Sequence, residues 1–197
     1  MFSLENLGVI SFKYFILIAL IALFYFWYVT IITRRNKALE ALSGIDVQLK
    51  QRLDLIPNIL KIAKKFMEHE VAIFNEVTAL REGLTKSYDN KDVSAVENHL
   101  KMSQELARKM QGLMVRVENY PQLSSSQNMI EAQQSYNEIE AQIVAARRFY
   151  NAAVNSLANS IQIFPGNILA NLIGIKAMPL FEAEEEVRAS VDANKFL

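Results

Sequence analysis

The sequence contains no cysteine, only two histidines and only six glycines among its 197 residues. Without cysteine the chain has no disulfide, no thiol nucleophile, no thiolate metal ligand and no lipoprotein attachment site. His69-Glu70 begins like a zinc-protease helix, but Ile73 stands where the second histidine ligand would be. Neither a Gly-rich phosphate loop nor a Gly-x-Ser-x-Gly motif occurs. We therefore expect no enzymatic activity, no metal site and no cofactor.

The chain also lacks an excess of charge of either sign, since Lys+Arg and Asp+Glu are both 21. A nucleic-acid-binding protein would show a basic excess or a basic stripe, so we expect no nucleic-acid partner. The basic residues that do cluster, Arg34, Arg35 and Lys37, directly follow an apolar run.

That run, residues 14–33, is twenty residues without charge, glycine or proline. Twenty helical residues cover about 30 Å, the thickness of a bilayer's hydrocarbon core. A cleaved signal peptide would have a shorter apolar region, about 7–15 residues, ending at small residues. A buried core helix is the other alternative, but the run stands alone at the start of the chain. We predict a transmembrane helix over 14–33 that follows a short N-terminal segment, residues 1–13, and binds the lipid bilayer.

The orientation of this helix follows from its flanks, because basic residues in short flanks tend to stay in the cytoplasm. Only Lys13 precedes the run, whereas Arg34, Arg35 and Lys37 follow it. We therefore expect residues 34–197 to form a cytoplasmic domain.

The scarcity of glycine and proline, and the absence of sustained alternation, predict an all-α fold. Apolar residues recur at steps of three and four over residues 39–84, 93–117 and 129–164. Ser124-Ser125-Ser126 offer an N-cap to the last helix, and Phe164-Pro165-Gly166 end it. Pro57 indicates either two helices or one kinked helix in the first region. The expected fold is an N-terminal single transmembrane helix followed by an antiparallel up-and-down bundle of three to four long helices.

The C-terminal part differs in character. Residues 168–180 are apolar but only 13 long, too short to cross a bilayer. They fold either onto the end of the bundle or against the membrane surface or a partner, the first being favoured. Residues 181–192, with several glutamates before Arg188, predict a short acidic C-terminal helix.

Polar motifs within residues 36–183 give the sequence a specific resemblance. They are residues 43–58 (SGIDVQLKQRLDLIPN), His69-Glu70, residues 118–123 (ENYPQL), Arg147, residues 150–155 (YNAAVN), Phe164-Pro165 and Phe181-Glu182. In this order they resemble the LemA family of bacterial membrane-anchored helical proteins. Ala158, and the aliphatic Ile173 and Ile175, depart from the family pattern. The resemblance implies a helical bundle at the bacterial cell (inner) membrane and no established activity, cofactor or metal.

Two interpretations of the polar motifs remain open. The candidate interaction or register residues are Asp46, Asp54, Pro57, Asn58, Arg147, Tyr150, Asn151 and Asn155. Asp46, Lys50 and Asp54 fall on one helical face at intervals of four, and Asn151, Asn155 and Asn159 fall on another. Hydrogen bonds between these two ladders could fix the register of the bundle, which is the favoured interpretation. In that case Asn58 would satisfy a carbonyl freed by Pro57. Alternatively, Asp54, Asn58, Arg147 and Asn151 line a groove for a partner helix or peptide.

These observations favour a membrane-anchored helical scaffold or protein-interaction protein with an unknown protein or peptide partner. The alternative is an extracytoplasmic ligand-sensing helical bundle, although only about 13 residues precede the predicted span. A homo-oligomer is possible, because the apolar stripe of residues 136–161 could also form a coiled-coil dimer.

Overall fold

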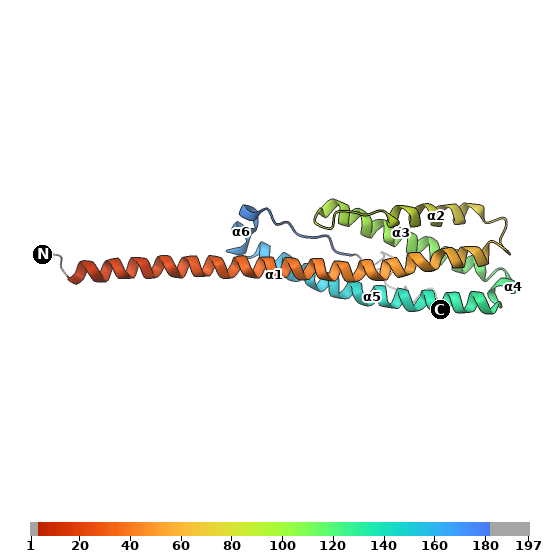
Figure 1. Cartoon of the computed structure of the whole chain (residues 1–197), viewed down its shortest axis with the longest axis horizontal. Coiled ribbons are helices and arrows are strands. Elements are labelled where there is room, and N and C mark those ends of the chain that lie inside the picture. The colour runs from red at the N-terminus through yellow and green to blue at the C-terminus, as the bar shows by residue number, and fades with distance from the viewer. Residues whose placement is uncertain (1–3, 182–197) are drawn as a thin grey trace, which may run out of the picture.

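The computed structural model describes residues 4–181 and contains only helices and connecting segments over that range, which confirms the all-α prediction (Figure 1). The helices are α1 (Leu4–Ala63), α2 (Val71–Thr85), α3 (Val93–Val117), α4 (Pro121–Ser124), α5 (Gln127–Gln162) and α6 (Gly166–Ile173). The acidic helix predicted for residues 181–192 lies almost entirely outside the described residues.

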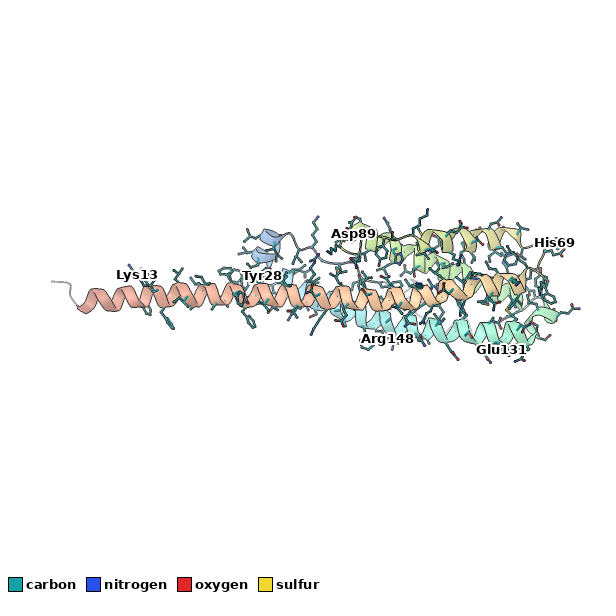
Figure 2. All side chains as sticks on the ribbon, viewed as in Figure 1. Lys13, Tyr28, His69, Asp89, Glu131 and Arg148 are labelled. Atoms are coloured by element: carbon teal, nitrogen blue, oxygen red, sulfur yellow. The ribbon has the colours of Figure 1, made fainter. Side chains whose placement is uncertain are left out.

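Helix α1 joins the apolar run and the first helix of the bundle into one element of 60 residues. Its N-terminal part extends beyond the other helices, and Figure 2 shows Lys13 on this free part and Tyr28 close to where the remaining helices begin. Most side chains of the run are exposed, whereas Ile31 near its end is completely buried. Of the helices in the described part of the chain, α1 is the one long and apolar enough to cross a membrane.

Pro57 does not break α1, which continues to Ala63. The interruption between the first and second bundle helices lies instead at residues 64–70. Because proline has no N–H, the carbonyl of Leu53 four residues earlier loses its helical donor. Arg81 of α2 replaces this donor, since its Nε donates to the Leu53 oxygen at 2.9 Å. Asn58, the residue expected in this role, is exposed.

The bundle is made of the C-terminal half of α1 with α2, α3 and α5, which run up and down in chain order (Figure 1). Helix α1 packs along α5, and α2 packs along α3. The Ser126 side chain caps α5 by accepting from the Met129 N–H, as expected. Ile143 in the middle of α5 is 4% exposed, so the apolar stripe of α5 does face the core.

The hydrophobic core has two parts. The distal cluster contains α1 residues from Leu53 onward together with residues of α2, α3, α4 and the start of α5. The proximal cluster, nearer the apolar run, contains α1 residues Ala38 to Leu49 and α5 residues Ile143 to Leu157.

The segment 168–180 consists of two parts with different structures, the end of helix α6 and an extended segment. Its first residues belong to α6, which Gly174 ends with φ of 69°, a conformation that glycine adopts without strain. The Ile175 N–H then donates to the Ala170 carbonyl at 3.0 Å, and the chain reverses. Residues 174–181, here called the C-terminal strap, return along the bundle, where Phe181 is buried in the proximal cluster.

Candidate functional site

Asp46 is the centre of a polar group on the side of the bundle where α1, α3 and the α2–α3 connection meet. The Tyr88 hydroxyl donates to the Asp46 carboxylate at 2.9 and 3.0 Å. His99 of α3 lies with its Nε2 3.5 Å from an Asp46 oxygen. The Tyr88 and His99 rings stack with centroids 4.1 Å apart. A cavity of about 430 Å³ adjoins these residues and is also lined by Lys50, Asp54, Arg81 and aliphatic side chains.

The protonation of the neighbouring tyrosines is set by burial and by Asp46. Burial and the Asp46 carboxylate raise the pKa of Tyr88 far above its ordinary value, so its hydroxyl keeps its proton and acts as a donor. Burial, with a smaller contribution from Asp46, also raises the pKa of Tyr150. The Tyr88 hydroxyl therefore stays protonated and donates its hydrogen bond to Asp46.

Three of the predicted residues hold the C-terminal strap. The Tyr150 hydroxyl donates to the Pro179 carbonyl at 2.7 Å. The Asn151 side-chain amide makes two bonds with the backbone of Phe181, donating to its carbonyl at 2.9 Å and accepting from its N–H at 2.8 Å. The Arg147 guanidinium lies 5.4 Å from the centre of the Phe181 ring, within cation–π range. These side chains thus recognise an extended segment, and that segment belongs to the chain itself.

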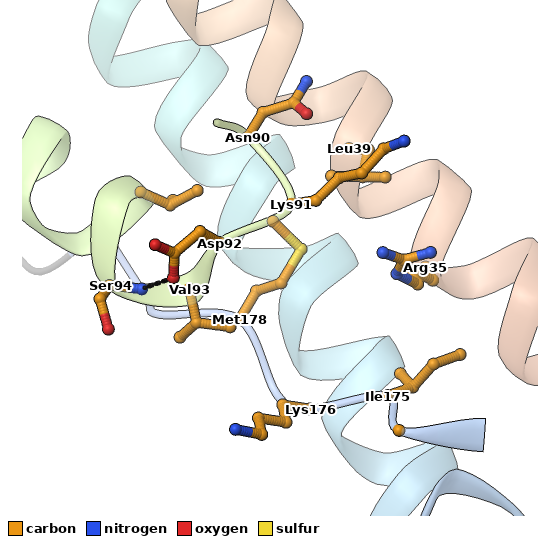
Figure 3. A pocket seen from close by; sticks show the side chains of 12 residues that line it. Arg35, Leu39, Asn90, Lys91, Asp92, Val93, Ser94, Ile175, Lys176 and Met178 are labelled. Carbon is orange, nitrogen blue, oxygen red and sulfur yellow. Dashed lines mark hydrogen bonds between the residues drawn. The ribbon is translucent and has the colours of Figure 1, made fainter. Parts of the chain in front are cut away.

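The strap also closes one side of a smaller cavity of about 280 Å³ next to the end of the apolar run (Figure 3). Arg35 approaches it from α1, Lys91 from the α2–α3 connection and Lys176 from the strap. The carboxylate in its wall, Asp92, accepts from the Ser94 N–H at 3.0 Å and so caps α3.

A buried ionic group crosses the core between its two clusters. Arg52 of α1 is 1% exposed and donates to Glu140 of α5 at 3.1 Å. It also donates to the Ser103 carbonyl at 2.9 Å and to the Ser103 hydroxyl at 3.1 Å, both on α3. Since it joins three helices at one level, this group fixes their relative register. This arrangement leaves one polar atom unpaired, since Arg52 Nε is buried without a hydrogen-bond partner among the described residues.

The expected ladder of carboxylates and asparagines is absent from the described residues. Asp54, Asn155 and Asn159 are exposed, and Asn151 bonds to the strap rather than to a carboxylate. Register is carried by Arg52, Ser103 and Glu140 instead. The residues expected to fix the register therefore do not do so, and a different set of polar residues joins the helices.

The expected groove of Asp54, Asn58, Arg147 and Asn151 does not form either. Asp54 lines the cavity beside Asp46, whereas Asn58 lines a separate cavity of about 460 Å³ between α1 and α5. Arg147 and Asn151 are occupied by the strap, and Pro57 is exposed on α1. Of the eight predicted residues, the structure groups only Asp46 with Asp54, and Arg147 with Tyr150 and Asn151.

Some residues of these sites carried a signal in the sequence and others did not. The buried α1 residues Leu42, Ile45, Leu49, Arg52, Ile56, Ile59 and Ala63 alternate steps of three and four. Arg52 interrupts this stripe, and a charge at such a position signals a buried ionic group. Tyr88 lies in a polar connection, where no period marks it, and His99 pairs with Asp46 only through the tertiary fold.

Two features define the class of all-α protein to which the chain belongs. An exposed apolar helix runs directly into a four-helix bundle, and the C-terminal strap returns to that bundle. Within this class the LemA family model matches residues 41–194, most of the chain, and the chain belongs to the LemA family. No match to a curated protein accompanies this assignment.

Proposed function

We propose that the protein is a membrane-anchored scaffold whose bundle binds a protein partner on the cytoplasmic side of the bacterial cell membrane. The observation that carries this proposal is the continuity of α1, which includes both the apolar run and the first bundle helix. A continuous helix transmits position without a flexible linker, so the bundle is held at a defined place relative to the bilayer.

The exposed side chains of the run support the membrane anchor. Phe15, Ile18 and Ile21 are each more than 60% exposed, although large aliphatic and aromatic residues usually avoid water. A bilayer would cover them, and the helix satisfies its own backbone groups there. Arg34 and Arg35, directly after the run, support the cytoplasmic placement of the bundle.

The bundle itself offers an exposed aromatic residue for partner binding. Phe149 on α5 is 74% exposed and belongs to the membrane-proximal half of the bundle. Exposed aromatic side chains are over-represented at protein interfaces. Glu138 lies eleven residues earlier on α5, about three helical turns away and on the same face, which makes it a matched control.

A photo-reactive aromatic amino acid at Phe149, in the full chain in native membranes, tests the partner. We expect a recurrent cross-linked species at Phe149 that does not form with the same amino acid at Glu138. The species should also decrease when an additional unlabelled copy of the protein is expressed. If both positions give the same products, the cross-linking is non-specific and the interaction surface is elsewhere or absent.

The cavity beside Asp46 favours a second candidate function, an extracytoplasmic bundle that senses a small molecule. Topology separates the two candidates. The chain has no cysteine, so a single cysteine at exposed Ser87 reports its own side of the membrane. The scaffold requires that Ser87→Cys reacts with an impermeant maleimide only after spheroplasts are lysed, while Ser3→Cys reacts before lysis. Labelling of Ser87→Cys in intact spheroplasts would favour the sensor.

A further inference from the structure

The connection from α5 to α6, and α6 itself, expose large apolar side chains to solvent. Leu172 is 77% exposed, Phe164 71%, Ile163 58% and Ile168 47%. No charged residue occurs between Ile163 and Ile173. An eight-residue helix with this much exposed apolar surface is typical of a segment that contacts something apolar.

The other side of α6 packs against α1 within the apolar run. Gly166 and Ala170, one helical turn apart, are both buried. Gly166 is required there because a Cβ would lie 1.9 Å from the Ser160 carbonyl oxygen and 3.4 Å from the Trp27 ring. The clash is with the backbone of α5, so Gly166 is needed for the sharp approach of α6 to the end of α5, while the Trp27 ring of α1 packs against α6 at van der Waals distance. Ile31 is completely buried, and Figures 1 and 2 show α6 beside the part of α1 that carries Tyr28.

This contact places α6 at a particular depth if the run spans the bilayer. Trp27 precedes Thr33, the last residue of the run, by six residues, or about 9 Å along the helix. Interfacial helices bury their apolar side about 5–10 Å below the headgroup boundary. The level of α6 therefore coincides with the outermost part of the hydrocarbon layer.

The charges next to α6 fit a lipid surface. Arg35, Lys91 and Lys176 surround the smaller cavity on the bundle side of α6, and Asp92, the one carboxylate that lines it, accepts from the Ser94 N–H (Figure 3). Arg35 comes two residues after the run, at the level of the lipid headgroups. Cations at headgroup level attract anionic lipids.

We propose that α6, together with Ile163 and Phe164, lies in the membrane interface and is a second contact of the protein with the bilayer. Its exposed apolar side chains enter the outer hydrocarbon layer, and Arg35, Lys91 and Lys176 face anionic headgroups. This inference rests on the proposed function, because the depth of α6 is set by a membrane-spanning α1. The two contacts fix the rotation and tilt of α1 and hence the orientation of the bundle.

The test uses the full chain in vesicles of phosphatidylcholine and phosphatidylglycerol. The environment-sensitive dye NBD is attached to a single cysteine at Leu172. The control is Val115→Cys, because Val115 is 58% exposed on α3 toward the distal end of the bundle. Trp27, the single tryptophan of the chain, reports insertion of α1 in the same samples.

We expect blue-shifted NBD emission at Leu172, quenching by brominated lipids, and a severalfold weaker quenching by aqueous iodide than at Val115. Trp27 should also be quenched by brominated lipids. If Trp27 is quenched but the Leu172 probe behaves like that at Val115, α1 spans the membrane and the inference about α6 is wrong. Protection of the Leu172 probe from both quenchers would show a protein contact and would also overturn it. Failure of brominated lipids to quench Trp27 would contradict the proposed membrane anchor itself.

Discussion

At the scale of single residues, the bundle depends on polar side chains that most cores avoid. Arg52 is nearly inaccessible to water, and its two terminal nitrogens donate to a carboxylate, a hydroxyl and a carbonyl from two other helices. Replacing all members of such a group by apolar residues can be neutral, whereas removing one partner leaves a buried charge. Each member is therefore sensitive to single substitution.

Glu140→Ala should lower the free energy of unfolding by about 1–3 kcal/mol, because the buried guanidinium of Arg52 loses its carboxylate partner. The loss stays at this level because the Glu140 side chain is 29% exposed and water replaces part of the interaction. Urea unfolding of the full chain in detergent, followed by circular dichroism, measures it. Glu138→Ala, at an exposed position on the same helix, should change the stability by less than about 0.5 kcal/mol. Equal effects of the two variants would contradict the role of the ionic group.

Alkaline pH should unfold the bundle through its buried tyrosines. Burial raises the pKa of Tyr136 and Tyr150 well above the ordinary value of 10.0, with further contributions from Glu140 and Asp46 respectively. Above pH 10 the unfolded chain releases protons that the folded chain keeps. Stability is therefore fully present below pH 10 and falls above it, by about 1.4 kcal/mol per pH unit for each such tyrosine.

Circular dichroism and tyrosinate absorbance, recorded together in an alkaline titration, test this. The buried tyrosines should ionise in the same step in which helix content is lost. Tyr136→Phe should make the pH dependence shallower. Ionisation of all seven tyrosines near pH 10 with helix content unchanged would show that Tyr136 and Tyr150 are accessible to solvent.

At the scale of elements, Pro57 and Arg81 form a pair that keeps α1 continuous. Proline removes one backbone donor, and Arg81 supplies another from α2. In Arg81→Ala the Leu53 carbonyl loses this donor, which should cost about 1–2 kcal/mol. In Pro57→Ala a normal helical bond becomes available to Leu53, so Arg81→Ala should cost less in that background. A double-mutant cycle by urea unfolding should therefore give a coupling energy of at least about 0.5 kcal/mol. Additive effects would mean that Arg81 acts independently of the proline.

The C-terminal strap is a second element held by a few identifiable bonds. Asn151→Ala removes both hydrogen bonds to Phe181, one of which protects the Phe181 N–H from water. Hydrogen exchange over residues 175–181 should accelerate, while exchange in the middle of α1 and α5 stays unchanged. Asn155→Ala, one helical turn further at an exposed position, should leave exchange in the strap unaltered. Unchanged exchange in Asn151→Ala would mean that Tyr150 and the apolar contacts of Phe181 suffice to hold the strap.

The elements were largely predictable from the sequence, but their connections and contacts were not. Residues 93–117 and the Ser126 cap matched α3 and α5, because apolar period and capping are local properties. The continuity of α1 through Pro57 depends on Arg81, which is distant in sequence. Asp46, Tyr150 and Asn151, three of the residues singled out in the sequence, make specific contacts in the structure, but not the contacts expected for a ladder or a partner groove. Their partners, Tyr88, Pro179 and Phe181, lie in connections that carry no periodic signal.

At the scale of the whole molecule, the protein is a rod, and in the proposed arrangement its far end lies away from the membrane. Helices α2, α3 and α5 lie along the C-terminal half of α1, and His69 marks the end opposite the apolar run (Figures 1 and 2). Such a shape suits the proposed scaffold, because it separates the end of the bundle next to the apolar run, where α6 and the strap lie, from the distal end.

The distance of the bundle's two ends from the bilayer should therefore differ strongly. From Thr33 to Ala63 the helix has thirty residues, so the distal end lies about 45 Å beyond the run, and a typical tilt of about 20° shortens this only slightly. Ser87 lies much closer to the run. Its neighbour Tyr88 bonds to Asp46, which is only thirteen residues, or about 20 Å, beyond Thr33 along α1. Energy transfer from a donor dye on a single cysteine to acceptor lipids measures both heights in the full chain. Ser87→Cys should transfer efficiently and His69→Cys weakly, and both positions are exposed. Equal transfer from the two sites would mean that the bundle lies flat on the membrane, so that α1 does not hold it upright.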